Sequence, residues 1–274
     1  MRSEEAEKVR PSIEVRRIDL EFSSALGARY AGDNPLLSAL FAALSVAFPP
    51  GERFFIASVR HYLPEVKDKA LRKAIFAFIG QEANHTKEHL VFNQFLDDVG
   101  YPALAMQEWV TRRIEDMQSR STPAQCLART AALEHFTAIM ASAVLGHPEL
   151  LERMPEEVAK LWAWHAIEEI EHRSVAFDVY QEMVGDEALR LRTMRVVTAF
   201  FCTLVSLRTV RMLQATGGLS DVIGIAQGLN VLWGVPGVFR KIVPQYLDYY
   251  RPGFHPSQHD YSHLVGPAME RYLS

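Results

Sequence analysis

The stretches Glu82-Ala83-Asn84-His85 and Glu169-Ile170-Glu171-His172 decide the fold, because both read Glu-x-x-His and both lie in apolar segments. A single glutamate precedes each copy on a separate segment, Glu52 before the first and Glu134 before the second. Residues three apart on a helix project from nearly the same face, so each pair can bind neighbouring ions. A four-helix bundle uses this order of residues to build a carboxylate-bridged site for two metal ions.

Apolar residues at helical spacing predict the helices that carry these motifs. The first runs from Asn34-Pro35 to an interruption at Pro49-Pro50-Gly51, which leaves Glu52 just beyond a break or at a helix restart. The others are predicted over about Pro64 to Asp98, over Ala124 to Leu145 after the cap Thr122-Pro123, and over Pro155 to about Val184. No alternating strand pattern occurs in the sequence, so we predict an all-α fold with additional C-terminal helices beyond Asp186.

Length and composition favour one domain. With 274 residues, 49% of them hydrophobic, the chain can bury one large core. We predict an N-terminal tail and docking segment over residues 1–30, with docking around Ile13 to Phe22, and a single helical dimetal-binding domain over residues 31–274. The net charge of −4 and the mixing of basic with acidic residues argue against nucleic acid as a partner.

Cysteine usage and the N-terminus predict a cytoplasmic protein. Cys126 and Cys202 form no Cys-x-x-Cys pair, and Met1 to Arg10 contain no apolar signal segment. A reducing compartment fits both observations best.

The most apolar run, Val196 to Leu207, predicts a buried helix. Its 12 residues fall short of the roughly 20 that cross a bilayer. Arg208 and Arg211 follow closely on one helical face, which leaves contact with a membrane surface as the less favoured alternative.

A third imidazole extends the metal-binding pattern. His165 lies one helical turn before Glu169, which gives His-x-x-x-Glu-x-x-His on one face. Four converging carboxylates would be costly to bury as bare anions, whereas two divalent cations cancel their charge. The predicted metal ligands are Glu52, Glu82, His85, Glu134, His165, Glu169 and His172. The expected arrangement puts Glu52 and His85 on one ion, Glu134, His172 and His165 on the other, and Glu82 with Glu169 bridging.

Several of these positions also fit a role without a metal ion. Glu52 would suit a solvated helix start, and His165 would suit a core histidine or an outer hydrogen-bond partner. Glu134 gains most from its context, because apolar residues surround it and an unpaired buried carboxylate would be hard to explain. The mixed carboxylate and imidazole set suits iron or manganese and is compatible with zinc.

Spacing alone does not separate Glu168 from Glu169. Glu168 lies three residues from His165 and four from His172, so it shares their helical face. Symmetry with the first Glu-x-x-His copy selects Glu169.

Further histidines are assigned lesser roles. Glu88 and His89 lie one turn beyond the first copy and are expected to be outer partners or to face solvent. The tail repeats an imidazole every fourth residue, at His255, His259 and His263, but Pro252, Gly253 and Pro256 make the start of that segment a loop. We expect no second metal site there.

The residues now assembled resemble a known family. Trp164 to His172, Ala176 to Tyr180 and Arg251 to Pro256 are similar to the ferritin-like bacterial proteins called predicted metal-dependent hydrolases. The resemblance covers most of residues 35 to 256 and implies a ferritin-like four-helix bundle with additional C-terminal helices. After the late Phe-His-Pro, this chain has Ser257-Gln258 where the family pattern has Trp-Asp.

The seven predicted ligands also resemble those of the histidine-rich di-iron arylamine N-oxygenases, whose last metal helix carries the same His-x-x-x-Glu-x-x-His pattern. This second resemblance implies a di-iron centre that activates O2. Our leading hypothesis is therefore a di-iron oxidase or oxygenase acting on a hydrophobic or aromatic small molecule. No flavin or nicotinamide motif occurs, so electrons would come from a separate donor protein or from the substrate.

Two other functions remain open from the sequence. A dimetal hydrolase with manganese, zinc or iron would use a metal-bound hydroxide. A non-enzymatic role in iron handling is the third hypothesis. The sequence does not fix the oligomeric state, and a homodimer is compatible with it.

Overall fold

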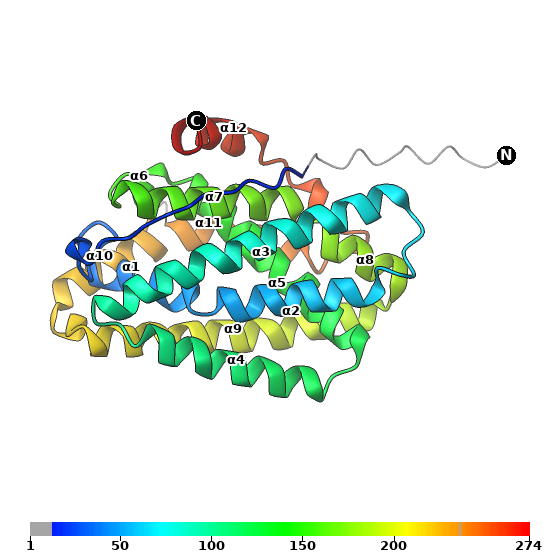
Figure 1. The fold of residues 1–274 in the computed structure, drawn as a ribbon, viewed down its shortest axis with the longest axis horizontal. Helices are drawn as coiled ribbons and strands as arrows, with labels where there is room; N and C mark the ends of the chain where they lie inside the picture. Colours follow the sequence, from blue (N-terminus) through cyan, green and yellow to red (C-terminus); the bar gives the residue numbers. More distant parts are fainter. Residues whose placement is uncertain (1–12, 236) are drawn as a thin grey trace.

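The computed structural model describes residues 13–235 and 237–274, and within them it contains helices and no strands. Figure 1 shows long helices lying side by side, with α3 next to both α7 and α2, and with α9 and α4 below them in this view. The all-α prediction is confirmed.

The predicted motif helices form as α2 (Phe48–Tyr62), α3 (Lys69–Asp98), α5 (Pro123–Leu145) and α7 (Glu156–His172), preceded by α1 (Pro35–Ser45). The starts of α3 and α5 follow from capping chemistry. The Asp68 side chain accepts the Ala70 N–H, and Thr122 forms a reciprocal capping box with Gln125. α2 packs against α3 and α5, while α7 packs against α5 and α3. The four helices therefore enclose a common interior.

Pro49 and Pro50 do not interrupt the helix that carries Glu52. They lie in the first turn of α2, where their missing N–H groups have no intrahelical acceptor to lose. Glu52 is thus an internal residue of α2 and is 1% exposed. Its alternative interpretation as a solvated helix start is wrong.

Two helix boundaries differ from the prediction. α3 begins at Lys69 rather than near Pro64, because Asp68 caps it. The helix predicted to reach Val184 ends at His172, and a separate helix α8 (Val175–Met183) follows. At this break Arg173 donates to the carbonyls of Pro256 and His259, so contacts with the distant C-terminal segment accompany the interruption.

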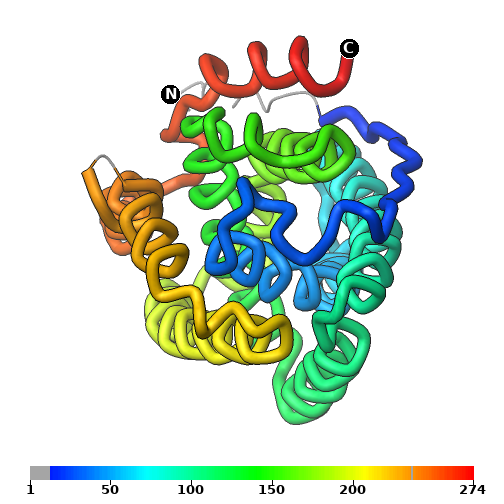
Figure 2. Tube along the Cα trace, turned by 90° about the vertical axis from the view of Figure 1, so that its left-hand side faces the viewer, coloured from blue at the N-terminus to red at the C-terminus, as the bar shows by residue number. Residues whose placement is uncertain are grey.

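The remaining helices cover the bundle: α4 (Ala103–Ser119), α6 (Pro148–Leu151), α9 (Glu187–Ala215), α10 (Val222–Trp233), α11 (Val238–Asp248) and α12 (Ser262–Tyr272). α9 packs along α1 and α5, α10 along α1, and α11 along α5. Figure 2 shows α9, α10 and α11, in yellow to orange, together on one side of the molecule.

The apolar run in α9 is only partly buried, which corrects the prediction of a buried helix. Phe200 and Leu207 are 62% and 61% exposed. In the part of the chain that the structure describes, three stretches are long and apolar enough to cross a membrane by length and composition alone: Pro35–Tyr62, Glu187–Ala215 and Val222–Asp248, the last of which runs across position 236, outside the described part. The expectation that the run was too short for this is therefore wrong.

The chain before α1 is not a passive tail where it is described. From Ile13 to Phe22 it runs extended along α7 and α3, the dark-blue segment in Figure 1. Phe22 packs edge-on against Phe92 with ring centroids 5.0 Å apart. Residues 1–12 of the predicted tail lie outside the described part.

The tail histidines hold the C-terminal segment in place. Nε2 of His255 lies 2.7 Å from the Asp178 carboxylate on α8, and Nε2 of His259 lies 3.0 Å from the Asp248 carboxylate on α11. His263 is exposed at the start of α12. The three imidazoles therefore have separate surroundings.

Candidate metal centre

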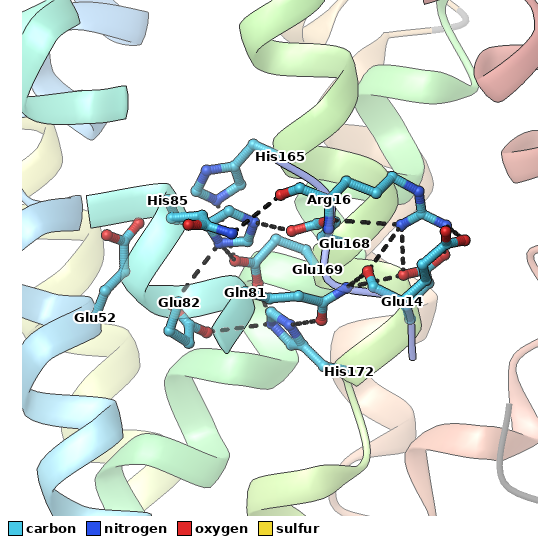
Figure 3. A network of polar contacts seen from close by, with 12 residues as sticks. Glu14, Arg16, Glu52, Gln81, Glu82, His85, His165, Glu168, Glu169 and His172 are labelled. Carbon is cyan, nitrogen blue, oxygen red and sulfur yellow. Dashed lines mark hydrogen bonds and ion pairs between the residues drawn. The ribbon is translucent and has the colours of Figure 1, made fainter. Parts of the chain in front are cut away.

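Four helices bring the seven predicted ligands into the interior of the bundle. They are Glu52 on α2, Glu82 and His85 on α3, Glu134 on α5, and His165, Glu169 and His172 on α7. Each is at most 4% exposed. Figure 3 shows all of them except Glu134 gathered between the helices.

His172 marks one end of the cluster. Its Nε2 lies 3.3 Å from Oε1 of Glu82, 3.3 Å from Oε2 of Glu134 and 3.4 Å from Oε2 of Glu169. Phe78 packs edge-on against the imidazole at 5.0 Å. Three carboxylates thus surround one ring nitrogen.

His85 and His165 mark the other end. Their rings stack with centroids 4.3 Å apart. Oε1 of Glu169 lies 3.0 Å from Nε2 of His165 and 3.6 Å from Nδ1 of His85, while Oε2 of Glu82 lies 3.8 Å from the same Nδ1. Glu82 and Glu169 therefore contact both ends of the cluster.

The donor atoms fall into overlapping groups that could each hold an ion. Within one group all donor atoms lie within 4.8 Å of one another, and the groups are Glu52, Glu82 and His85; His85, His165 and Glu169; Glu82, Glu169 and His172; and Glu52, His89 and His165. Glu82 and Glu169 recur between the two ends, where bridging carboxylates would lie. His165 lies with His85 and Glu52, which differs from its expected place beside Glu134 and His172 (Figure 3).

Most of the donor atoms lack hydrogen-bond partners within the described residues. Nine buried side-chain atoms without a partner belong to the seven predicted ligands, and each of the seven contributes at least one. Buried polar atoms are ordinarily satisfied, because an unpaired one costs about 1–3 kcal/mol. Unpaired oxygens and nitrogens that face one another are the donor set that two divalent cations would complete.

Hydrogen bonds outside the cluster leave an imidazole lone pair directed into it at two histidines. Nε2 of His85 lies 3.1 Å from Oε2 of Glu168, an acceptor, so in the neutral ring Nε2 is the donor and Nδ1 carries the lone pair. Gln81 donates its amide to the Glu14 carbonyl, so its Oε1 accepts from Nδ1 of His172 at 3.0 Å. Nε2 of His172 is then the nitrogen that faces the carboxylates.

A series of hydrogen bonds from Ser45 through His89 likewise orients the ring of His165. Ser45 donates to Asn93 at 2.6 Å and accepts from Nδ1 of His89 at 2.9 Å. Nε2 of His89 accepts in turn from Nδ1 of His165 at 2.8 Å, so Nε2 of His165 carries a lone pair. All three histidines are therefore oriented as neutral metal ligands by partners outside the cluster.

Burial dominates the ionisation of the glutamates. It raises the pKa of Glu52 to about 8 and raises the pKa values of Glu82 and Glu134 well above their usual range. Burial acts in the same direction on Glu169, but His172 and His165 together lower its pKa. The side chains alone favour protons on several carboxylates, and divalent cations would replace those protons.

The imidazoles respond to burial and to the carboxylates in opposite directions. Burial and the charge of His85 lower the pKa of His165 to about 4. Burial also lowers the pKa values of His85 and His172, because it disfavours the charged imidazolium. The carboxylate of Glu168 nevertheless raises the pKa of His85, and the carboxylate of Glu169 raises that of His172. The carboxylates therefore favour positive charge inside the cluster, and a bound metal ion would supply it.

Family membership agrees with this geometry. A sequence model of one protein family, described as predicted metal-dependent hydrolase, matches residues 14–260. The chain belongs to this family. The family resemblance stated from the sequence is confirmed, while the ferritin-like relationship and the likeness to arylamine N-oxygenases stay predictions. Neither the curated proteins nor the solved structures gave a match.

In this member of the family, the two adjacent glutamates on α7 have different surroundings. Glu169 lies among the donor groups, whereas Glu168 faces the far side of His85 and accepts the Arg16 backbone N–H at 3.1 Å. Both side chains are buried. Glu168 therefore orients a predicted ligand, and Glu169 remains the predicted bridging carboxylate.

Sequence reasoning predicted a docking segment around Ile13 to Phe22 but missed its contacts beside the predicted ligands. The Arg16 guanidinium binds both oxygens of Glu171 at 2.8 Å, and Asn84 donates to the Arg16 carbonyl at 3.0 Å. Glu171 also accepts from Gln81, which holds His172. No spacing rule connects Arg16 to Glu171, which lies 155 positions later in the chain, so the sequence offered no signal for this contact.

Gln81 and Thr86 were also missed, although each has a local signal. Gln81 directly precedes the first Glu-x-x-His copy, and Thr86 directly follows it and donates to Oε2 of Glu52 at 2.8 Å. Both are polar residues next to predicted ligands. Glu88 and His89 were expected to be outer partners or to face solvent; both are buried, so the solvent-facing alternative is wrong, and His89 bonds His165 as an outer partner would.

Proposed function

We propose that this protein is a dimetal hydrolase. The observation that carries the proposal is the convergence of nine unpaired buried donor atoms from all seven predicted ligands. Membership of a family described as predicted metal-dependent hydrolase supports the reaction class. When bound, two divalent cations would supply an acidified water and a polarised substrate carbonyl or phosphoryl group.

The residues of the chain would divide the work. Glu82 and Glu169 lie between the two ends and would hold the ions at a fixed separation. Glu168, Gln81 and His89 fix the three imidazoles, which keeps their inner nitrogens available. Manganese, zinc and iron all suit this oxygen and nitrogen donor set.

Metal analysis followed by an assay of ester, phosphoester and amide substrates tests the proposal. We expect two ions per chain and hydrolysis that is lost on chelation, restored by manganese or zinc, and equal in air and under nitrogen. Glu169→Gln should abolish activity and lower the metal content. The matched control is Glu88→Gln, which changes a buried glutamate of α3 outside the donor groups and should keep both.

A di-iron oxidase is the second candidate, and one observation favours it. Phe48 packs on His165 at 4.6 Å, Trp164 on His85 at 4.8 Å and Phe78 on His172 at 5.0 Å. This aromatic enclosure restricts water, which an oxidase does not need and a hydrolase does. Anaerobic loading with Fe(II) and exposure to O2 distinguishes the two: stoichiometric O2 uptake without hydrolysis of any substrate would replace the hydrolase proposal.

A further inference from the structure

Exposed apolar side chains are concentrated on one side of the molecule. Among the described residues, 18 large hydrophobic side chains are exposed, and 12 of them lie between Val196 and Leu247. They belong to α9, α10, α11 and the turns between these helices, which lie together in Figure 2. We call this surface the α9–α11 face. Apolar patches of this kind mark interaction sites.

The α9–α11 face contains a groove. Its volume is about 420 Å³, and side chains of α1, α5, α9, α10 and α11 line it. Four of its lining residues are also exposed by 44–55%: Val210, Leu229, Trp233 and Val243. The exposed apolar residues therefore continue from the surface into the groove.

Basic residues accompany the apolar ones. From Glu187 to Asp248, the span of α9 to α11, the chain contains seven arginines and lysines and three acids, Glu187, Asp221 and Asp248, which gives +4. The whole chain carries −4, so the remaining residues carry −8. Asp221 is bound by Arg29 at 2.7 Å, which neutralises it. The exposed basic residues are Arg192, Arg195, Arg211, Arg240 and Lys241.

We propose that the α9–α11 face docks on the surface of an anionic lipid bilayer. Exposed apolar side chains would enter the boundary between headgroups and acyl chains, with Trp233 at the depth that tryptophan prefers. The neighbouring arginines and lysines would attract anionic headgroups. This docking is independent of which reaction the metal centre performs.

Charge argues against a second copy of this chain as the occupant. A symmetric dimer through the face would place the same basic surface on both sides and bring like charges together. An anionic bilayer supplies the opposite charge instead.

Packing argues against a membrane-spanning α9. The helix buries Met194, Val205 and Met212 against the rest of the protein and packs along α1 and α5. Crossing a bilayer would require α9 to leave these contacts. Docking leaves them intact and uses only the outer side of the helix.

Sedimentation of the full chain with lipid vesicles tests the proposal. We expect binding to vesicles of phosphatidylglycerol and phosphatidylcholine, weak binding to phosphatidylcholine alone, and loss of binding at high salt. The double variant Phe200→Ser with Ile223→Ser should weaken binding at least about tenfold, because two apolar side chains no longer enter the bilayer. Arg240→Gln with Lys241→Gln should weaken it about fivefold for each charge removed.

The matched controls are Phe76→Ser and Trp109→Ser on α3 and α4, where both side chains are also exposed but lie off the face. They should bind as the parent chain does. Equal losses in the control and face variants would overturn the proposal.

Quenching of tryptophan fluorescence by brominated lipid is a second measurement, and it does not require a variant that binds vesicles less tightly. Trp162 and Trp164 are buried, so Trp109→Phe leaves Trp233 as the exposed tryptophan. Brominated lipid should quench this variant and should not quench Trp233→Phe beyond background. Quenching that survives Trp233→Phe would overturn the proposed face, as would vesicle-free dimerisation that the Phe200 and Ile223 changes abolish. Release from membranes by detergent alone, and not by alkaline carbonate, would show a spanning helix and also overturn it.

Discussion

Helices α7 and α9 place side chains in opposite ways. α7 buries charged and titratable groups, with His165, Glu168 and Glu169 all at most 4% exposed. α9 exposes large apolar groups, with Phe200 and Leu207 more than 60% exposed. Soluble proteins usually do neither, because buried charge costs solvation and exposed apolar area costs hydration. Each helix departs from the usual distribution where another component, metal ions inside or lipid outside, would compensate.

The largest expected effect is that of metal on stability. Bound ions would stabilise the folded state by about 4 kcal/mol at a free concentration roughly 1,000 times the dissociation constant. In a domain of this size that raises the melting temperature by about 8–16 °C. Thermal unfolding before and after chelation measures it. Glu169→Ala should remove the difference, and an unchanged melting temperature on metal addition would contradict the proposed role of the buried carboxylates of α7.

The second prediction concerns the outer partner of His172. Gln81→Leu removes the acceptor that holds Nδ1 of His172, so the ring can change its tautomer and orientation. We expect metal affinity to fall about 10–100-fold, as is typical when such partners are lost. Titration with Mn(II) or Zn(II) measures the change. The control is Gln94→Leu, an exposed position of α3 whose amide binds Asp98, and a similar loss there would show a general effect on the helix.

A smaller loss is expected when the N-terminal segment loses its arginine. Arg16→Ala breaks the two contacts with Glu171 and the longer guanidinium contact with Glu168 at 3.5 Å, but it keeps the backbone N–H that Glu168 accepts at 3.1 Å. The His85 partner therefore stays in place, and metal affinity should fall only a few-fold. Hydrogen exchange across residues 13–22 should nevertheless become faster. Arg17→Ala changes an exposed neighbour and is the control. If Arg16→Ala lowered metal affinity as much as Gln81→Leu, the side chain of Arg16 would orient the predicted ligands themselves and not only the N-terminal segment.

The same contrast explains how far the sequence could predict this protein. The repeated Glu-x-x-His and helical periodicity located the four helices and predicted seven residues that the structure brings together, because both signals depend on local spacing. The contact of Arg16 with Glu171, and those of Arg173 at the end of α7 with Pro256 and His259, join residues distant in sequence, which spacing does not contain. The run from Val196 to Leu207 is apolar on every side, so periodicity could not show that one side of it is exposed.

The smallest expected effect tests whether α9 has a free outer side. Phe200→Ser should change the free energy of unfolding by less than about 0.5 kcal/mol, because the side chain leaves few contacts behind. Met194→Ala on the same helix should cost about 2–5 kcal/mol, because Met194 is fully buried. Chemical denaturation of both variants in the absence of lipid measures the pair. A cost for Phe200→Ser close to that of Met194→Ala would mean that Phe200 packs within the protein, and the α9–α11 face would then lose one of its most exposed members. A large difference would leave Phe200 free to contact lipid, since its exposure would not be needed for any internal packing.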